Sequence, residues 1–464
     1  MAEPLAALTR HYESLATKWQ VCDRSGDYAP LVVPTGNSQE PFHRWFRMKE
    51  AYSHALLPQL LKEREAVPGG LSLLDPFSGG GTTAVSGISY ARSVGVPVDI
   101  MAIERNPVLR VISHAKCAGI RRGSELAELT EDAYAQVVAA SRRLKSRPEL
   151  LDTPSVTLRN PSYYSDANRT SLLALGKAAA ECELDSDARA VIQTCIAAAV
   201  EPAGRLRRDG RALRYTPERK PADPVDVFGE SVNRCIVDMR LARAAEHGAS
   251  FSLASGDARQ VDVLSGGRRF NWIVFSPPYP NNIDYTEIYK TEAWALGFYD
   301  DIASMKAQRL KTLRSHTSLY FPEEYAYLSG RRSGDVQALI SPVLAAIPVD
   351  RYERGRRQLV RGYVDDMLRV LAACRAICTD DAQLALVVGN SVHGIGENRF
   401  VIAADLLIAA LGELSGWEVV EIRIARRLRR RSTDSRYSRE SVVVLRPSLA
   451  FNSCDEISPL HKPA

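Results

Sequence analysis

The sequence predicts an α/β protein built on a doubly wound, mostly parallel sheet. Strand-like apolar runs alternate with helical patterns in two blocks, over about residues 40–120 and from about residue 250 to the end. Strands that alternate with helices favour a parallel sheet. The last two runs, WEVVEIRIARR and SVVVLRPS, are joined by a segment too short for a right-handed helical crossover, so we expect them to form an antiparallel hairpin.

Seven segments carry the strand pattern. In the first block, LSLLDPF and VDIMAIE flank the helical stretch TTAVSGISYARSVG. In the second block, FSLASGD, NWIVFSPP and QLALVVGNS precede the two closing runs. The amphipathic stretch RGYVDDMLRVLAACRAIC and the glycine-terminated stretch ADLLIAALGELSG should form helices between them. The expected sheet is therefore seven-stranded.

Residues 123–247 interrupt this scheme, because Ala-rich helical stretches replace the strand pattern there. They predict a helical insertion between two parts of one domain, residues 1–122 and 248–450, which a tail at 451–464 follows. Residues 300–360 have the pattern of a second, less regular insertion.

Composition and charge set limits on the function. The chain has 464 residues and a net charge of +5, so a role with nucleic acid must rest on local clusters. The N-terminus lacks the pattern of a signal peptide, and no run reaches the roughly 18 apolar residues of a membrane span. The eight cysteines are scattered without metal-ligand spacing. We expect a cytoplasmic protein with free thiols, no membrane span and no metal site.

A glycine-rich segment, DPFSGGGTT at residues 75–83, follows the first strand of this scheme and opens a helix. Consecutive glycines let backbone N–H groups approach a ligand, and a helix N-terminus favours an anion. A P-loop is excluded because no lysine precedes the threonine pair, and the spacing differs from a dinucleotide fingerprint.

Acidic residues follow at the ends of the next two strands. Glu104 comes roughly 20 residues after Gly81, where an acid suits the two hydroxyls of a ribose. Asp257, in the turn after the third strand, could accept a hydrogen bond from an adenine amino group. Together with the glycine loop they predict a pocket for an adenosine-bearing ligand at the switch point of the sheet. The alternative is a structural glycine turn with two helix-capping carboxylates.

A second loop, Ser276-Pro277-Pro278-Tyr279, stands at the tip of the next strand. The serine hydroxyl and the carbonyl groups held by the prolines form a fixed array of acceptors. Such an array could accept hydrogen bonds from an exocyclic amine and free its lone pair to attack a methyl group. Tyr279 offers a flat face for a base taken out of its stack. The alternative is a proline-rich loop with a packing tyrosine.

The combination of DPFSGGGTT with SPPY resembles the amino-directed DNA methyltransferases, which use S-adenosyl-L-methionine. The resemblance covers about residues 40–120 and 250–447 and implies a Rossmann-like methyltransferase fold. HRWFRMKEAYS at residues 43–53 resembles the family's N-terminal cofactor-contacting segment, and RESVVVLR resembles its closing hairpin.

The resemblance implies roles for individual residues. It makes Ser276, Pro277, Pro278 and Tyr279 the catalytic loop. The residues that it places at the cofactor are Trp45, Asp75, Phe77, Gly79, Gly81, Thr82, Glu104, Asp257 and Ala258. No metal is implied.

The serine of the loop bears on the target base. Cytosine-N4 enzymes of the family usually carry serine at this position, whereas adenine-N6 enzymes usually carry aspartate or asparagine. Serine is neutral, so it accepts from the amine without strong charge assistance. No Pro-Cys pair is present for methylation at cytosine C5. We expect cytosine N4 as the target. Adenine N6, an RNA or protein amide substrate, and a non-catalytic module that binds S-adenosylmethionine and DNA are the alternatives.

Three arginine-rich stretches, residues 205–220, 309–318 and 423–439, are candidate contacts to double-stranded DNA. Arginine clusters suit phosphate contacts, and Tyr215 and Tyr437 could stack on bases. Solvated charge runs are the alternative. The residues expected at the substrate are Arg208, Asp284, Tyr285, Arg314, His316 and Arg430. The helical insertion occupies the place of a target-recognition region, and a restriction endonuclease or defence-system protein is a candidate partner.

Overall fold

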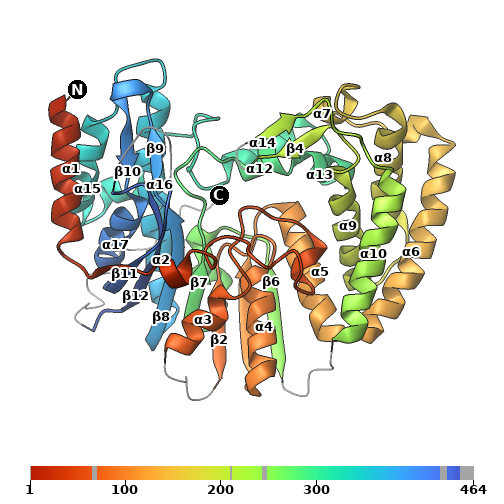
Figure 1. The fold of residues 1–464 in the computed structure, drawn as a ribbon, viewed down its shortest axis with the longest axis horizontal. Helices are drawn as coiled ribbons and strands as arrows, with labels where there is room; N and C mark the ends of the chain where they lie inside the picture. Colours follow the sequence, from red (N-terminus) through yellow and green to blue (C-terminus); the bar gives the residue numbers. More distant parts are fainter. Residues whose placement is uncertain (1, 65–69, 210–211, 243–247, 429–435, 450–464) are drawn as a thin grey trace.

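The computed structural model describes residues 2–64, 70–209, 212–242, 248–428 and 436–449. Its centre is an eight-stranded sheet with the order β1-β11-β12-β8-β7-β2-β3-β6 (Figure 1). The strands are β1 (Val21–Asp23), β2 (Leu71–Asp75), β3 (Val98–Ile103), β6 (Ala249–Ala254), β7 (Phe270–Phe275), β8 (Cys378–Gly389), β11 (Trp417–Arg427) and β12 (Arg439–Pro447).

The sheet is mostly parallel. Strands β6, β3, β2, β7 and β8 pair in parallel, whereas β12 runs antiparallel to both β8 and β11. The predicted α/β class and the C-terminal antiparallel hairpin are therefore confirmed, and all seven predicted strands are present. The predicted strand number was one too low, because β1 pairs in parallel with β11 at the edge. Its three residues, VCD, are too few to show an alternating pattern.

Both faces of the sheet are covered, which explains why its strands are continuously apolar. Successive side chains of a strand point to opposite faces. In β7, Trp272 and Val274 belong to one buried cluster and Ile273 and Phe275 to the other. The first cluster includes α4 (Thr82–Val94) and α5 (Pro107–Arg122), and the second includes α16 (Glu353–Ala376) and α17 (Ala404–Leu414).

The other helices complete these layers and the connections between them. They are α1 (Ala2–Ala16), α2 (Ser25–Tyr28), α3 (Leu56–Glu63), α11 (Val261–Leu264), α12 (Tyr285–Ile288), α13 (Lys290–Ala295), α14 (Ile302–Leu310) and α15 (Ser333–Ala345). A short two-stranded ladder is formed by β9 (Ser391–His393) and β10 (Phe400–Ile402).

The region between β3 and β6 adds a helical lobe at the right of Figure 1. It contains α6 (Ser124–Lys145), α7 (Val156–Arg159), α8 (Asp166–Glu181), α9 (Ser186–Val200), α10 (Pro224–Leu241) and a hairpin of β4 (Leu206–Arg208) with β5 (Leu213–Tyr215). The small buried side chains of α9, such as Ala190, Ala197 and Ala199, let it lie close against α5. The lobe therefore shares one core with the sheet.

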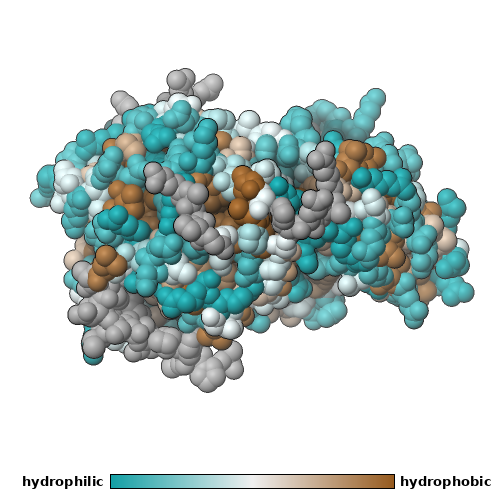
Figure 2. All heavy atoms as spheres, turned by 90° about the horizontal axis from the view of Figure 1, so that it is seen from below, coloured by the Kyte–Doolittle hydropathy of each residue, from teal (hydrophilic) through white to brown (hydrophobic). Residues whose placement is uncertain are grey.

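One face of the molecule shows how apolar side chains are distributed on the surface. On the face seen in Figure 2, hydrophobic residues form separate patches among hydrophilic ones. Within the described ranges, no helix is long and apolar enough to cross a membrane.

Candidate active site

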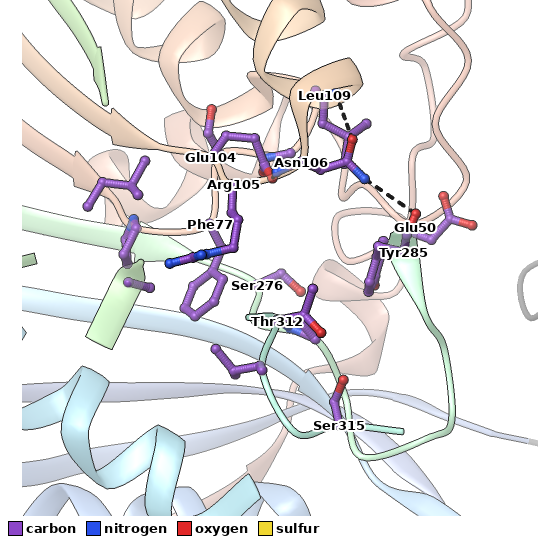
Figure 3. Close-up of a pocket in the computed structure, with 18 of the residues that line it drawn as sticks. Glu50, Phe77, Glu104, Arg105, Asn106, Leu109, Ser276, Tyr285, Thr312 and Ser315 are labelled. Carbon is purple, nitrogen blue, oxygen red and sulfur yellow. Dashed lines mark hydrogen bonds between the residues drawn. The ribbon is translucent and has the colours of Figure 1, made fainter. Parts of the chain in front are cut away.

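A pocket opens where β2, β3, β6 and β7 end, the edge at which doubly wound sheets bind their ligands. Each of these strands contributes the residues that follow it, so four loops converge on one space. Figure 3 shows Glu104, Ser276 and Thr312 around this space. A further wall comes from residues 308–316, at the end of α14 and in the segment that follows it.

The structure brings most of the predicted site residues to this pocket. The predicted residues that line it are Asp75, Phe77, Gly79, Thr82, Glu104, Asp257, Ala258, Ser276, Pro278, Tyr285 and His316. Those that do not line it are Trp45, Gly81, Arg208, Pro277, Tyr279, Asp284 and Arg314. Arg430 lies outside the described residues.

The glycine loop approaches the pocket closely and rests on α5. Gly79 has a φ of 51°, and its N–H donates to Glu104 Oε2 at 2.8 Å. Gly81, with a φ of 81°, caps α4 and faces away from the pocket. A Cβ at Gly81 would lie 2.9 Å from Ser113 Oγ, so the close packing of the loop on α5 requires glycine.

Two carboxyl groups at the pocket are held by backbone donors. Glu104 accepts from Gly79 N through one oxygen and from Asn106 N, at 2.7 Å, through the other. Asp75 accepts from Phe77 N at 2.9 Å and from the Thr83 hydroxyl. Burial raises the pKa of each carboxyl to about 7. These groups therefore favour a ligand that brings positive charge or hydroxyl donors.

Asp257 is held differently, by arginines. Its Oδ1 accepts from the N–H and Nε of Arg259, and its Oδ2 accepts from Arg105 Nη2 at 3.0 Å and Arg259 Nη2 at 2.6 Å. Burial alone would raise the pKa of Asp257. The hydrogen bonds and positive charges of Arg259 and Arg105 outweigh this effect, so the pKa lies below its usual value. All four acceptor positions of the carboxylate are filled, so an adenine amino group would have to displace an arginine.

The serine of the catalytic-loop motif is oriented by the strands beside it. Ser276 Oγ lies 3.1 Å from the carbonyl oxygen of Val387 on β8, to which it can donate its single proton. Its lone pairs are then free to accept from the pocket side. Tyr279 Oη lies 3.3 Å from Ser276 Oγ and donates to Glu440 Oε1 at 2.7 Å. The Tyr279 ring packs on Gly389, where a Cβ would approach it to 2.8 Å.

The wall at residues 308–316 is fixed by a buried arginine. Arg314 donates through its backbone N–H and its Nη2 to Asp366 on α16, at 2.8 and 2.7 Å, and Nη2 also bonds Asp365 at 2.5 Å. Its Nη1 donates to the carbonyl oxygen of Glu324. The prediction that Arg314 contacts DNA was wrong, because its guanidinium is buried and its charge is neutralised inside the protein.

Asp284 and His316 lie together beside this wall. Asp284 caps α12 through Thr286 N at 3.1 Å and accepts from Arg309 Nε at 2.9 Å. Its Oδ2 is 3.7 Å from His316 Nε2, and His316 Nδ1 is 2.7 Å from Ser318 Oγ. Burial lowers the pKa of His316, against the attraction of Asp284. Of this pair only His316 reaches the pocket.

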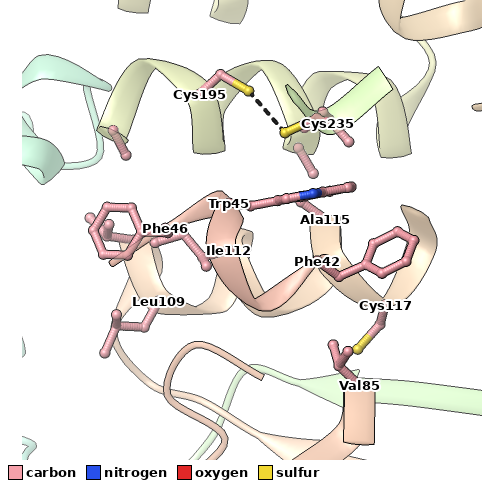
Figure 4. Packing of buried hydrophobic residues seen from close by; sticks show 14 of the residues in the cluster. Phe42, Trp45, Phe46, Val85, Leu109, Ile112, Ala115, Cys117, Cys195 and Cys235 are labelled. Carbon is pink, nitrogen blue, oxygen red and sulfur yellow. Dashed lines mark hydrogen bonds between the residues drawn. The ribbon is translucent and has the colours of Figure 1, made fainter. Parts of the chain in front are cut away.

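Two more of the predicted residues are buried structural groups. Arg208 pairs with Glu201 at 2.7 Å and with Glu292 at 3.3 Å, so the prediction that it contacts DNA was wrong. Trp45 donates to Asp238 Oδ2 at 2.9 Å and packs on Gly119 of α5, away from the pocket. Figure 4 shows Trp45 in the core between α5 and the helices that carry Cys195 and Cys235.

The third arginine-rich stretch is also bonded internally. Its described arginines pair with carboxylates of other elements, among them Arg423 with Glu63 at 2.5 Å and Arg439 with Asp405 at 2.7 Å. Tyr437 is buried and cannot stack on a base as predicted.

Comparison with known proteins identifies relatives of the whole chain. No family model matches it. The type II methyltransferase M.BsoBI of Geobacillus stearothermophilus is 21% identical, over 91% of this chain and 87% of its own length. The type II methyltransferases M.AvaI of a Nostoc species and of Anabaena variabilis are each 22% identical, over 84% of this chain and 82% of theirs. Over most of its length the chain is thus similar to type II methyltransferases.

Among solved structures, the rRNA methyltransferase aviRa from Streptomyces viridochromogenes matches 88% of this chain and 85% of its own chain. The identity is 10% and the TM-score is 0.26, a likeness that carries no argument.

Several residues that line the pocket were missed by sequence reasoning. Asn106 caps α5, accepting from Val108 N at 3.0 Å, and its Nδ2 reaches the carbonyl oxygen of Tyr285 at 3.4 Å (Figure 3). The Asn-Pro pair at 106–107 is a helix-start signal that could have located it. Glu50, which accepts from Tyr289 Oη at 2.9 Å, lies in the segment 43–53 that the resemblance had marked, although only Trp45 was named from it. The wall residues Thr312 and Ser315 have no comparable local signal.

Proposed function

We propose that this protein transfers a methyl group from S-adenosyl-L-methionine to the exocyclic N4 of cytosine in double-stranded DNA. One observation carries the proposal: Ser276 lies at a pocket beside the glycine loop, and Val387 O, 3.1 Å from Ser276 Oγ, can accept its proton and so leave its lone pairs for an amine donor. The type II methyltransferase relatives support the same class of reaction.

The residues present fit S-adenosylmethionine. Each oxygen of Glu104 already accepts one backbone N–H and keeps one acceptor position, which suits the two adjacent hydroxyls of a ribose. The buried carboxyls of Asp75 and Glu104 favour a cationic ligand, and the sulfonium of this cofactor supplies an electrophilic methyl group. Phe77, which packs on Phe275 with ring centroids 5.4 Å apart, offers an apolar wall.

The catalytic step needs an acceptor rather than a strong base. Ser276 Oγ accepts a hydrogen bond from the exocyclic amine, which draws the nitrogen toward sp³ geometry and frees its lone pair. The nitrogen–carbon bond to the methyl group forms while the carbon–sulfur bond breaks, and the extra proton of the amine passes to water. Tyr279 stays protonated, because burial and the nearby Glu440 raise its pKa well above its usual range, and it holds the loop through Glu440.

The target base follows from the neutrality of the acceptor. Ser276 brings no charge to the amino group that it contacts. Enzymes of the resembled family that carry serine at this position usually methylate cytosine N4, so we propose the same target here. Adenine N6 is the alternative target. As a partner protein we propose a cognate endonuclease. The pocket can receive only a base taken out of the duplex, because Ser276 lies at the end of a buried strand.

A labelled-methyl assay tests this proposal. Purified protein is mixed with duplex DNA and methyl-labelled cofactor, and wild type is compared with Ser276→Ala and with Ser72→Ala. Ser72 lies at the opposite end of the sheet and serves as the matched control. We expect label in DNA with wild type and Ser72→Ala, and at least a ~100-fold lower rate with Ser276→Ala. Equal rates for all three, label in RNA alone, or cofactor binding without transfer would contradict the proposal.

A further inference from the structure

The β4–β5 hairpin of the helical lobe has two faces of different character. In its register, Arg207 lies opposite Arg214, and Arg208 lies opposite Leu213. Arg208 is buried, whereas Arg207 and Arg214 are exposed. The hairpin thus has an inner face that contacts the protein and an outer face that carries two adjacent arginines.

The inner face fixes the hairpin relative to the pocket. Arg208 pairs with Glu292 of α13 at 3.3 Å, and its guanidinium lies 5.2 Å from the ring centroid of Tyr289. Tyr289 in turn donates to Glu50, which lines the pocket. Lys49 donates to the carbonyl oxygen of Arg208. Figure 1 shows β4 beside α13, above the edge of the sheet at which the pocket opens.

The outer face holds positive charge that the protein does not neutralise. Like charges directly opposite each other on two strands are destabilising. Arg207 has no carboxylate partner among the described residues, and Arg214 has only Asp209 at 3.7 Å, with 72% of its side chain exposed. Tyr215 lies opposite Leu206 and so belongs to the inner face, where its ring packs on Tyr163 with centroids 5.4 Å apart, whereas Lys220 is exposed five residues beyond β5. This arrangement is explained if an anion lies between the two arginines.

The other two arginine-rich stretches differ from the hairpin in this respect. Every described arginine of residues 309–318 and 423–439 forms an ion pair with a carboxylate, namely Arg309, Arg314, Arg423, Arg426, Arg427, Arg436 and Arg439. Charge that is already paired contributes little to an electrostatic contact with a polyanion. Of the three stretches, the one with the hairpin therefore has the arginines that are least neutralised by carboxylates. The hairpin also lies on the same side of the molecule as the pocket.

We infer that the outer face of the hairpin, Arg207 and Arg214, together with Lys220 beyond β5, binds the sugar-phosphate backbone of the duplex DNA whose base enters the pocket. This inference rests on the proposed function. A phosphate between Arg207 and Arg214 removes their mutual repulsion, and Lys220 adds positive charge beside it. Because the inner face is anchored next to the pocket, these contacts set the register of the duplex over it.

Salt-dependent binding of a fluorescent 30-base-pair duplex tests the inference. Each lost phosphate contact lowers the slope of log affinity against log salt by about 0.9, so Arg207→Ala/Arg214→Ala should lower it by about 2 and weaken binding roughly tenfold or more. The charge-conserving Arg207→Lys/Arg214→Lys should keep most of the wild-type slope. Arg142→Ala/Arg143→Ala, on the exposed face of α6, is the matched control and should leave the slope unchanged.

Cofactor affinity and methyl transfer at saturating DNA are measured on the same proteins, because they separate the two claims. The inference is overturned with the proposed function intact if the wild type methylates DNA but both alanine pairs keep its slope. A wild type that transfers no methyl group to DNA, or that prefers single-stranded RNA to the duplex, overturns the proposed function and the inference together. A lysine pair as weak as the alanine pair would show a structural rather than an electrostatic role.

Discussion

The two sides of the pocket are built in different ways. On the sheet side, Glu104 bonds to backbone groups of its own and the preceding strand loop, and Ser276 bonds to the neighbouring strand. On the wall side, Arg314 reaches buried Asp365 and Asp366, about fifty residues further along the chain. The sheet side is thus fixed by short loops at strand ends, whereas the wall depends on a long-range charge network. The sheet side should tolerate single changes that the wall does not.

The largest effect is expected from breaking the wall network. Asp366→Ala removes the carboxylate that bonds both Arg314 and Arg259, and leaves two buried guanidinium groups short of a partner. We expect the free energy of unfolding to fall by about 3–5 kcal/mol, as is typical when one partner of a buried pair is removed. Denaturant unfolding measures this loss. The exposed Asp335, 3.9 Å from Arg332, is the matched control, and Asp335→Ala should cost less than about 1 kcal/mol. Equal losses would remove the distinction between the two sides.

An intermediate effect is expected from the glycine loop on the sheet side. Gly81→Val forces a β-branched residue to a φ of 81° and drives its Cβ into Ser113. We expect about 1–3 kcal/mol of lost stability together with at least ~10-fold weaker cofactor binding. Gly267→Val, at an exposed turn with a similar φ of 86° and open space around it, controls for backbone strain alone. If both variants bind the cofactor normally, the loop does not shape the pocket.

This contrast explains how much of the molecule could be predicted from its sequence. The strands, the hairpin and the residues Glu104 and Ser276 follow local patterns, because apolar runs end at polar or glycine-rich turns. The burial of Arg208 and Arg314 could not be predicted, since an arginine in a basic stretch gives no sign of the distant carboxylate that neutralises it. Trp45 was assigned to the cofactor because it lies in the segment 43–53. In the structure its indole N–H donates to Asp238, a distant residue that the segment itself does not indicate.

A smaller effect is expected from Glu104→Gln. The amide keeps the shape of the side chain but offers only one accepting oxygen, so one of the two ribose contacts is lost. We expect roughly tenfold weaker cofactor binding, worth about 1.4 kcal/mol. Stability should fall by about 1–3 kcal/mol, because the amide NH2 faces the backbone N–H of Gly79 or Asn106 in place of an accepting oxygen. Isothermal titration with a non-reactive cofactor analogue measures it. Asp257→Asn should weaken binding less, because the Asp257 carboxylate is already saturated by Arg105 and Arg259. The reverse order would contradict our assignment of the two acids.

The smallest effect is a pH dependence of cofactor binding. Burial raises the pKa of Glu104 and of Asp75 to about 7, so below pH 7 both carboxyl groups of the cofactor-free protein are mostly protonated. Binding of the cofactor to the ionised carboxylates then requires that these protons be released. Affinity should therefore rise as the pH increases from about 5 to 7 and level off above it. The free energy of unfolding of the cofactor-free protein should fall over the same range, because the folded state binds these protons more tightly than the unfolded chain. Glu104→Gln should make both profiles shallower and leave the contribution of Asp75. An affinity that falls with rising pH would contradict the account.

The central claim is the transfer of a methyl group to cytosine N4 at Ser276. Mass spectrometry of nucleosides from cells that express wild type or Ser276→Ala tests it most directly. We predict N4-methylcytosine in the DNA of cells with the wild type and none above background with Ser276→Ala. N6-methyladenine in its place, or equal N4-methylcytosine in both samples, would contradict the claim.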